Sequence, residues 1–258
     1  MRRLVLLTAI GVMAFTAVAY AVTNTLTYTA TVSVKGKPST KTPANMAYSS
    51  VLHIDTDPAG QQPDIGPTTT VFFAKGVKLN AKYFPFCNKD EIDGQAAFPV
   101  KCNKAVVGTG TATAYAGQPG QPRANSVKES LTVKVVNGSK GKSLYLVVNS
   151  TPDAPVAIQN RVIPGTIGSS SGLFAYSVRF DIPPDLQQQL GLSISLTDFS
   201  VKISSTAKKI KVSGKFIKAA YLQLTACKAH KLPVKAITQF KDTTGNLHPV
   251  TSQTAAKC

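Results

Sequence analysis

The sequence predicts an all-β, antiparallel fold, either a β-sandwich or a strongly curved, partly closed sheet of about 11–12 strands. Most apolar stretches alternate with period two, which is typical of half-buried strands. The stretches are separated by short segments rich in Gly, Pro, Asn and Asp, and no long crossover is available to join parallel strands. With 258 residues and 43% apolar residues, the chain is long enough and apolar enough to form a core.

The alternation is clearest at residues 25–34, where Thr and Ser occupy one face and Leu26, Tyr28 and Val32 occupy the other. A hairpin is predicted where two apolar runs flank the Gly-rich segment 137–141. The other strands expected in the first part of the chain are residues 46–54, 69–77, 106–116, 131–135 and 144–148.

The second part of the chain continues the pattern, with one short helix near residues 185–190 after Pro183-Pro184. The apolar phase changes near Asp198, which predicts a β-bulge there. The turn Asp242-Thr243-Thr244-Gly245-Asn246 leads into a final strand. The further strands expected here are residues 174–182, 192–204, 209–218 and 234–240.

Residues 1–21 are predicted to be a signal peptide, because Arg2 and Arg3 precede an apolar run that ends at Ala19-Tyr20-Ala21. Cleavage is expected between Ala21 and Val22, which gives a secreted, extracytoplasmic protein that is not integral to the membrane. The alternative is an uncleaved membrane anchor. The mature part, residues 22–258, is expected to be one β domain, and the alternative is a split into two lobes at the Pro-containing segment 151–155.

Four cysteines in a secreted chain suggest two disulfides, for which three pairings are possible. We favour the pairing local in sequence, Cys87–Cys102 and Cys227–Cys258, which the loop-entropy relation makes worth about 3 and roughly 3.5–4 kcal/mol. A redox or metal role is disfavoured, because the chain has no C-x-x-C pair and no His at ligand spacing from the cysteines.

The sequence predicts no catalytic site and no cofactor. Gly168-Ser169-Ser170-Ser171-Gly172 matches G-x-S-x-G, but a strand rather than a helix is expected after it, so a flexible loop is favoured. The weak metal candidates are His53, Asp55 and Asp57, which follow one another at two-residue spacing, so that His53 and Asp55 share a face of a strand. A strand end followed by an Asp-Pro turn explains the same residues and is favoured. A hydrolase with an unrecognised polar cluster stays an alternative.

The formal net charge is +17, and most of the excess lies near the C-terminus. Residues 202–257 contain eleven lysines and a single acidic residue, Asp242. Lys209, Lys211 and Lys215 share one phase of the expected strand 209–218, which would direct a lysine row to water. This row is the anion-binding candidate, although lysines on an edge strand also serve solubility and block sheet-to-sheet association.

Three segments together resemble uncharacterised secreted proteins of actinobacteria. They are Phe86-Cys87, Cys102 followed by V-G-T-G-T-A-T-A at residues 107–114, and the hairpin that runs from Cys227 through Asp242-Thr243-Thr244-Gly245 to Cys258. The matching segments make up a minor part of the mature chain. The resemblance implies a secreted all-β domain with two local disulfides, and it implies no activity and no site.

These observations predict a secreted or cell-envelope-associated, non-enzymatic β protein. Its lysine-rich C-terminal face is expected to bind an anionic cell-wall polymer, a lipid or another protein. Intracellular nucleic acid is not an expected partner, because the chain is secreted and aromatic residues do not interleave with the lysines. A purely structural surface protein is a further alternative.

Overall fold

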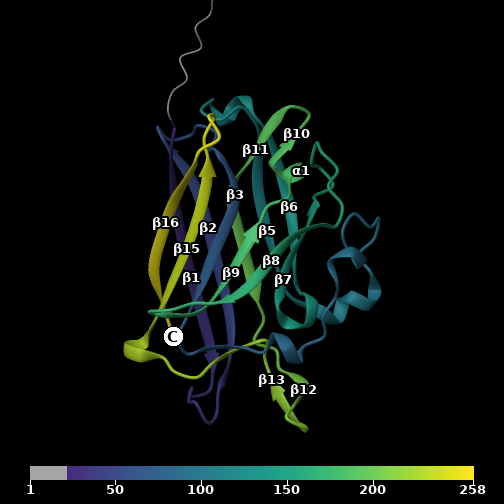
Figure 1. Ribbon diagram of the computed structural model, residues 1–258, viewed down its shortest axis with the longest axis vertical. Coiled ribbons are helices and arrows are strands. Elements are labelled where there is room, and N and C mark those ends of the chain that lie inside the picture. Colours follow the sequence, from purple (N-terminus) through teal and green to yellow (C-terminus); the bar gives the residue numbers. More distant parts are fainter. Residues whose placement is uncertain (1–21) are drawn as a thin grey trace, which may run out of the picture.

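The computed structural model describes residues 22–258, which form mostly antiparallel strands (Figure 1). Within these residues, one large sheet contains 14 strands and a small sheet contains two. The prediction of an all-β, antiparallel fold is therefore confirmed. The predicted signal peptide, residues 1–21, lies outside the described residues.

The large sheet has the spatial order β16-β15-β3-β9-β8-β7-β6-β5-β11-β2-β14-β4, with β1 paired to β2 and β10 paired to β11. Its strands are β1 (Thr23–Lys35), β2 (Ala44–Asp57), β3 (Ile65–Ala74), β4 (Val77–Leu79), β5 (Val106–Gly117), β6 (Val127–Asn137), β7 (Ser143–Ser150), β8 (Arg161–Ser169), β9 (Phe174–Asp181), β10 (Gln188–Gln189), β11 (Leu192–Ile203), β14 (Leu222–Leu224), β15 (Lys231–Lys241) and β16 (Leu247–Lys257).

Short helical turns join some of these strands. The α-helix α1 (Pro184–Gln187) lies between β9 and β10, so the predicted helix near 185–190 exists but ends earlier. The 3-10 turns are η1 (Ala81–Tyr83), η2 (Lys89–Glu91), η3 (Val100–Ala105), η4 (Arg123–Asn125), η5 (Ser139–Gly141) and η6 (Lys228–His230).

The large sheet is strongly curved, so that β1 and β16 from its two ends lie against each other. No strand ladder joins these two strands within residues 22–258. Instead, the backbone N–H of Tyr28 donates a hydrogen bond to the Ser252 hydroxyl at 2.9 Å. The curvature gives the sheet an enclosed inner face, which carries most of the buried apolar side chains.

The outer face of β6, β7 and β8 is also covered, here by the segment that contains η2 and η3. Ile92 and the two cysteines Cys87 and Cys102 pack there against Tyr145 and Val147. Leu144 and Leu146 of the same strand, β7, face inward. Both faces of β7 are therefore buried, which explains why residues 144–148 are apolar without alternation.

Several local predictions are confirmed. The β6–β7 hairpin forms around η5, and the register of β11 against β5 shifts between Leu196 and Asp198, where a bulge was predicted.

The strand count exceeds the predicted 11–12 because very short strands such as β4, β10 and β14 join the sheet and β8 was not expected. The strands on the two sides of residues 151–155, β7 and β8, pair with each other in the same sheet.

Residues 209–218 do not form the single strand that was predicted. They belong to a hairpin of β12 (Lys208–Val212) and β13 (Lys215–Ala219), which forms the small sheet. Ser213 and Gly214 connect the strands with φ values of 46° and 83°, a backbone conformation that glycine adopts readily. In Figure 1 this hairpin projects at one end of the long axis, and α1 lies toward the other end.

Candidate functional site

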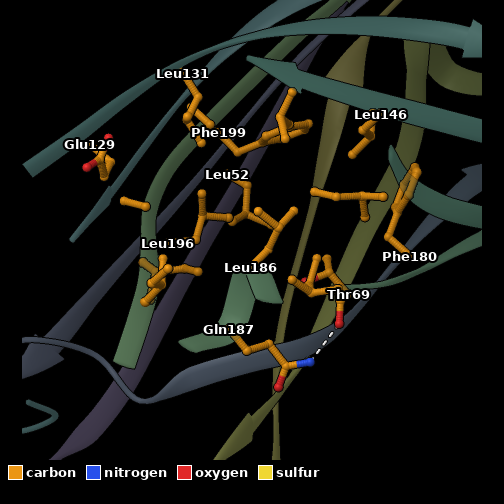
Figure 2. A pocket seen from close by; sticks show the side chains of 18 of the residues that line it. Leu52, Thr69, Glu129, Leu131, Leu146, Phe180, Leu186, Gln187, Leu196 and Phe199 are labelled. Carbon is orange, nitrogen blue, oxygen red and sulfur yellow. Dashed lines mark hydrogen bonds between the residues drawn. The ribbon is translucent and has the colours of Figure 1, made fainter. Parts of the chain in front are cut away.

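The inner face of the curved sheet encloses an apolar cavity of about 320 Å³. Strands from β1 round to β15 contribute side chains to its wall, so no single segment of the chain forms it. Most of these side chains are aliphatic or aromatic. Figure 2 shows Leu52, Leu131, Leu146, Phe180 and Phe199 converging on the cavity from different strands.

Small side chains on β5 help to keep this space open. Ala112, Ala114 and Ala116 all line the cavity, on the inner phase of the strand. Their neighbours in β6 and β11 are mostly larger residues, such as Leu131 opposite Ala112 and Leu196 opposite Ala114. Three methyl groups therefore replace the larger side chains that a tightly packed core would place along this strand.

The cavity is elongated and opens at the end of the sheet where α1 lies. The lining residues on β6 extend from Val127 to Val135, a span of about 26 Å at roughly 3.3 Å per residue. The exposed members of the lining are Val127, Pro155 and Leu190, and Leu190 is 95% exposed. These three residues form the rim, and the side chain of Leu186 from α1 points into the cavity (Figure 2).

A few polar groups interrupt the apolar wall, and most of them satisfy each other. The hydroxyl groups of Tyr28 and Tyr48 lie 2.5 Å apart, and burial raises the pKa of both. The hydroxyls of Thr69 and Thr238 form another pair at 3.0 Å. Gln187 Nε2 donates to the backbone oxygen of Ile182.

Glu129 is the exception among these polar groups. Its residue is only 2% exposed, and neither carboxyl oxygen has a hydrogen-bond partner in the described part of the chain. Burial raises the pKa of the carboxyl, and the nearby backbone of Val156 opposes this to a smaller extent. Glu129 lies at the margin of the cavity near Leu131 (Figure 2).

A second feature is a concentration of lysines at the end of the molecule opposite α1, which we call the lysine-rich end. The β12–β13 hairpin, the β1–β2 connection, the segment from β3 to η1 and the start of β15 meet there, because the ladders place these chain positions beside one another. Lys104, whose backbone oxygen accepts a hydrogen bond from Lys208, Lys142, which follows η5 beside η1, and Lys257, which pairs with Lys231, join them. The lysines of this end are Lys35, Lys37, Lys41, Lys75, Lys78, Lys82, Lys104, Lys142, Lys208, Lys209, Lys211, Lys215, Lys218, Lys231 and Lys257.

None of the lysines in this group forms an ion pair with a carboxylate in residues 22–258. Many carboxylates lie at the other end, near the cavity rim, where arginines neutralise several of them. Arg123 pairs with Asp55, Arg161 with Asp185, and Arg179 with Asp181. The two ends of the molecule therefore differ in charge.

The hairpin divides the predicted lysine row between its two faces. Lys209 lies opposite Lys218, and Lys211 lies opposite Phe216, so these four share a face. Lys215 pairs with Val212 and lies on the other face with Ile210. The prediction that Lys209, Lys211 and Lys215 form one row is therefore wrong, because the turn between the strands changes the phase.

The hairpin combines positive charge with exposed apolar surface. Phe216, on the face of Lys209 and Lys211, is 63% exposed, and Ile217, on the other face opposite Ile210, is 40% exposed. The ammonium groups of Lys209 and Lys211 lie 4.7 and 6.0 Å from the centre of the Phe216 ring, which is cation–π geometry. Ile210, on the other face of the hairpin, is buried.

The weak metal candidates are not brought together. His53 Nδ1 lies 2.7 Å from Asp198 Oδ1, and Asp55 is paired with Arg123. Asp57 is exposed at the end of β2. A guanidinium thus occupies the position beside Asp55 that a cation would take.

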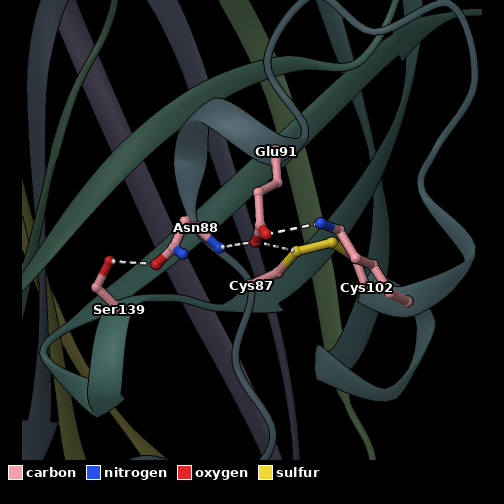
Figure 3. Close-up of a disulfide and its surroundings, with 6 residues drawn as sticks. Cys87, Asn88, Glu91, Cys102 and Ser139 are labelled. Atoms are coloured by element: carbon pink, nitrogen blue, oxygen red, sulfur yellow. Dashed lines mark hydrogen bonds and ion pairs between the residues drawn. A yellow bond between two sulfur atoms is a disulfide. The ribbon is translucent and has the colours of Figure 1, made fainter.

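Both predicted disulfides form, Cys87–Cys102 and Cys227–Cys258, with Cα–Cα distances of 5.4 and 6.2 Å. Glu91 lies against the first disulfide and accepts hydrogen bonds from the Asn88 backbone and from Lys101 (Figure 3). Cys87, Glu91 and Cys102 are close enough together to hold a metal ion, but the two cysteine sulfurs are bonded to each other in the disulfide. The disulfides indicate an oxidising, extracytoplasmic environment.

Sequence reasoning missed the cavity and Glu129, although the pattern held a signal for the latter. Leu131, Val133 and Val135 are alternate residues on the inward face of β6. The next two residues of this alternation toward the N-terminus are Glu129 and Val127. An acidic residue on an otherwise apolar inward phase indicates a functional position.

No helix among residues 22–258 combines the length and apolar character of a membrane span. Comparisons of the chain with protein-family models, with curated proteins and with solved structures found no match. The function is therefore inferred from the site itself.

Proposed function

We propose that this protein is a secreted, non-enzymatic carrier that binds an elongated apolar molecule, such as a lipid chain, in its internal cavity. The cavity supports this proposal because it is apolar and opens at one end of the sheet. Its volume of about 320 Å³ falls within the range of small-molecule sites. The inward span of about 26 Å exceeds the thickness of one bilayer leaflet, roughly 15 Å, so an extended chain can lie along it.

The first experiment measures binding of a series of linear alcohols of increasing chain length, by displacement of a fluorescent apolar dye. Each methylene that enters the cavity is worth about 0.8 kcal/mol, which is roughly a fourfold gain in affinity. We expect this gain to continue with chain length until the cavity is filled. Affinity that does not depend on chain length contradicts the proposal.

A matched pair of variants locates the binding. Ala114→Leu fills part of the cavity, whereas Thr111→Leu adds a similar side chain at an exposed position of the same strand, β5. We expect Ala114→Leu to weaken binding of the longer alcohols and Thr111→Leu to leave it unchanged. Ala112→Leu serves as a second filling variant if Ala114→Leu does not fold.

The lysine-rich end supports a second function, association with an anionic lipid surface. The segments that form this end contain no Asp or Glu, and the lysines lie beside the exposed Phe216 and Ile217. Lysines near an anionic membrane contribute about 1 kcal/mol each, and apolar side chains add affinity by entering the interface. We favour a lipid surface over an anionic cell-wall polymer because a hydrated polymer offers no apolar phase to Phe216.

Sedimentation with phospholipid vesicles tests this second function. We expect binding to phosphatidylglycerol vesicles, weakening as salt is added, and little binding to phosphatidylcholine vesicles. The double variant Lys209→Gln/Lys211→Gln should bind about 30-fold more weakly. Lys128→Gln/Lys241→Gln removes the same charge away from the lysine-rich end and should have a smaller effect. Binding to cell-wall material but not to vesicles contradicts the lipid proposal.

A further inference from the structure

Among residues 22–258, the buried carboxyl of Glu129 has no hydrogen-bond partner, although the cavity wall around it is otherwise apolar or internally hydrogen-bonded. Neither oxygen forms a hydrogen bond within the part of the chain that the structure describes, and the residue is 2% exposed. A buried polar group without a partner is unfavourable and rare in folded proteins. Its persistence at a cavity wall suggests that a bound molecule supplies the missing partner.

The position of Glu129 fits the polar end of an elongated ligand. It lies two residues from the rim residue Val127, about 7 Å along β6, and six residues from Val135, about 20 Å. Its ladder partner on β5 is Ala114, whose small side chain leaves space beside the carboxyl. A chain that extends toward Val135 would therefore leave its polar end beside Glu129, near the mouth.

We propose that Glu129 binds the polar end of the cavity ligand, and that this end is a hydroxyl or amine on a long apolar chain. This inference rests on the proposed carrier function and specifies its ligand. A carboxylate accepts hydrogen bonds only, whereas a protonated carboxyl also donates one. A hydroxyl can donate to either form, and an amine supplies N–H donors. When Glu129 is ionised, an ionised fatty acid at the same position would place two carboxylates together, which is unfavourable.

The test compares dodecanol, dodecylamine and dodecanoate, which share one chain and differ in the polar end. Affinities are measured at pH 8, by displacement of the apolar dye diphenylhexatriene. A hydrogen bond to a charged group contributes enough for a tenfold or larger difference. We therefore expect dodecanol and dodecylamine to bind the natural protein at least about tenfold more tightly than dodecanoate.

Two variants separate the charge of Glu129 from its hydrogen bonding. Glu129→Leu should weaken binding of dodecanol and dodecylamine and strengthen binding of dodecanoate. Glu129→Gln keeps hydrogen-bonding capacity without charge, so dodecanol binding should persist while dodecanoate binding improves. Lys128→Gln, at the exposed neighbouring position, changes a charge outside the cavity and should leave the order of the three ligands unchanged.

The results distinguish this inference from the carrier function. If diphenylhexatriene binds but the three ligands have equal affinity, or if Glu129→Leu preserves their order, the role of Glu129 is refuted and the carrier function stands. If diphenylhexatriene and all three ligands fail to bind, the carrier function is refuted, and the role of Glu129 with it.

Discussion

The hydroxyl groups of Tyr28 and Tyr48 lie 2.5 Å apart on neighbouring strands, inside the curved sheet. Both side chains are buried, and the ring centre of Tyr48 also lies 5.5 Å from that of Phe73 in β3. The pair thus connects β1 and β2 to the opposite wall of the cavity. Each hydroxyl satisfies the other in a place with little access to water.

Removing one hydroxyl of this pair should lower the free energy of unfolding by more than half of the loss that removing both hydroxyls causes. Tyr48→Phe leaves the Tyr28 hydroxyl without this partner, and we expect a loss of about 1–2 kcal/mol in the free energy of unfolding. The double variant Tyr28→Phe/Tyr48→Phe leaves neither hydroxyl behind. It should therefore be more stable than the sum of the single changes predicts, by about 1 kcal/mol. Urea unfolding of the four proteins measures this coupling, and strict additivity contradicts it.

The raised pKa of Glu129 should make the free energy of unfolding decrease as the pH rises. Burial raises its pKa in the folded protein above the unfolded value of about 4.3. Its contribution is therefore fully present below the unfolded pKa and is lost as the pH rises through the folded pKa. We expect Glu129→Gln to gain stability relative to the natural protein between about pH 4 and pH 8. Urea unfolding at both pH values tests this. A difference in free energy of unfolding between Glu129→Gln and the natural protein that is the same at both pH values contradicts the prediction.

Glu91 should show the opposite dependence on pH. The hydrogen bond from Lys101 lowers the pKa of this carboxyl, and the Asn88 backbone acts in the same direction. Its stabilising contribution is present above the unfolded pKa and is lost as the pH falls. Glu91→Gln should therefore be less stable than the natural protein at about pH 8, and the difference should close toward pH 3. The same unfolding measurements check the sign, and a difference that widens on acidification is evidence against it.

The sequence predicted those strands that have one buried face and one solvent-exposed face. β1 and β2 were predicted because polar and apolar residues alternate along them. β8 was not expected, because Pro164, Gly165 and Gly168 interrupt its pattern. In the structure Gly165 lies close to the ring of Phe180 and to the Leu144 backbone, so its missing side chain is a requirement of packing.

The candidate sites depend on pairings that no local pattern reveals. Lysines from the β1–β2 connection, such as Lys37 and Lys41, join those of the hairpin only because the start of β2 pairs with β14. The size of the cavity likewise depends on the distance between β5 and the strands that face it across the inside of the curved sheet. Inward alanines indicate a small side chain, but they do not by themselves indicate whether a neighbour fills the space.

The disulfide Cys227–Cys258 should be a major source of stability for the β15–β16 hairpin. It closes a loop with a sequence separation of 31 residues, for which the loop-entropy relation gives about 3.7 kcal/mol. The variant Cys227→Ser/Cys258→Ser should lose roughly this amount in urea unfolding. Amide exchange should also quicken at the start of β15 and the end of β16, and unchanged exchange there would show that the hairpin does not need the bond.

Phe216 should supply the part of membrane binding that salt does not remove. Its ring is 63% exposed beneath the ammonium groups of Lys209 and Lys211, and entry of such a ring into an interface is worth about 1–2 kcal/mol. We expect Phe216→Ser to weaken binding to phosphatidylglycerol vesicles roughly 5- to 30-fold, with most of the loss persisting at high salt. Leu247→Ser removes a side chain of similar exposure at the other end of the molecule and should have no effect. Equal losses for the two variants would mean that the hairpin does not enter the membrane and that exposed apolar surface binds vesicles without selection.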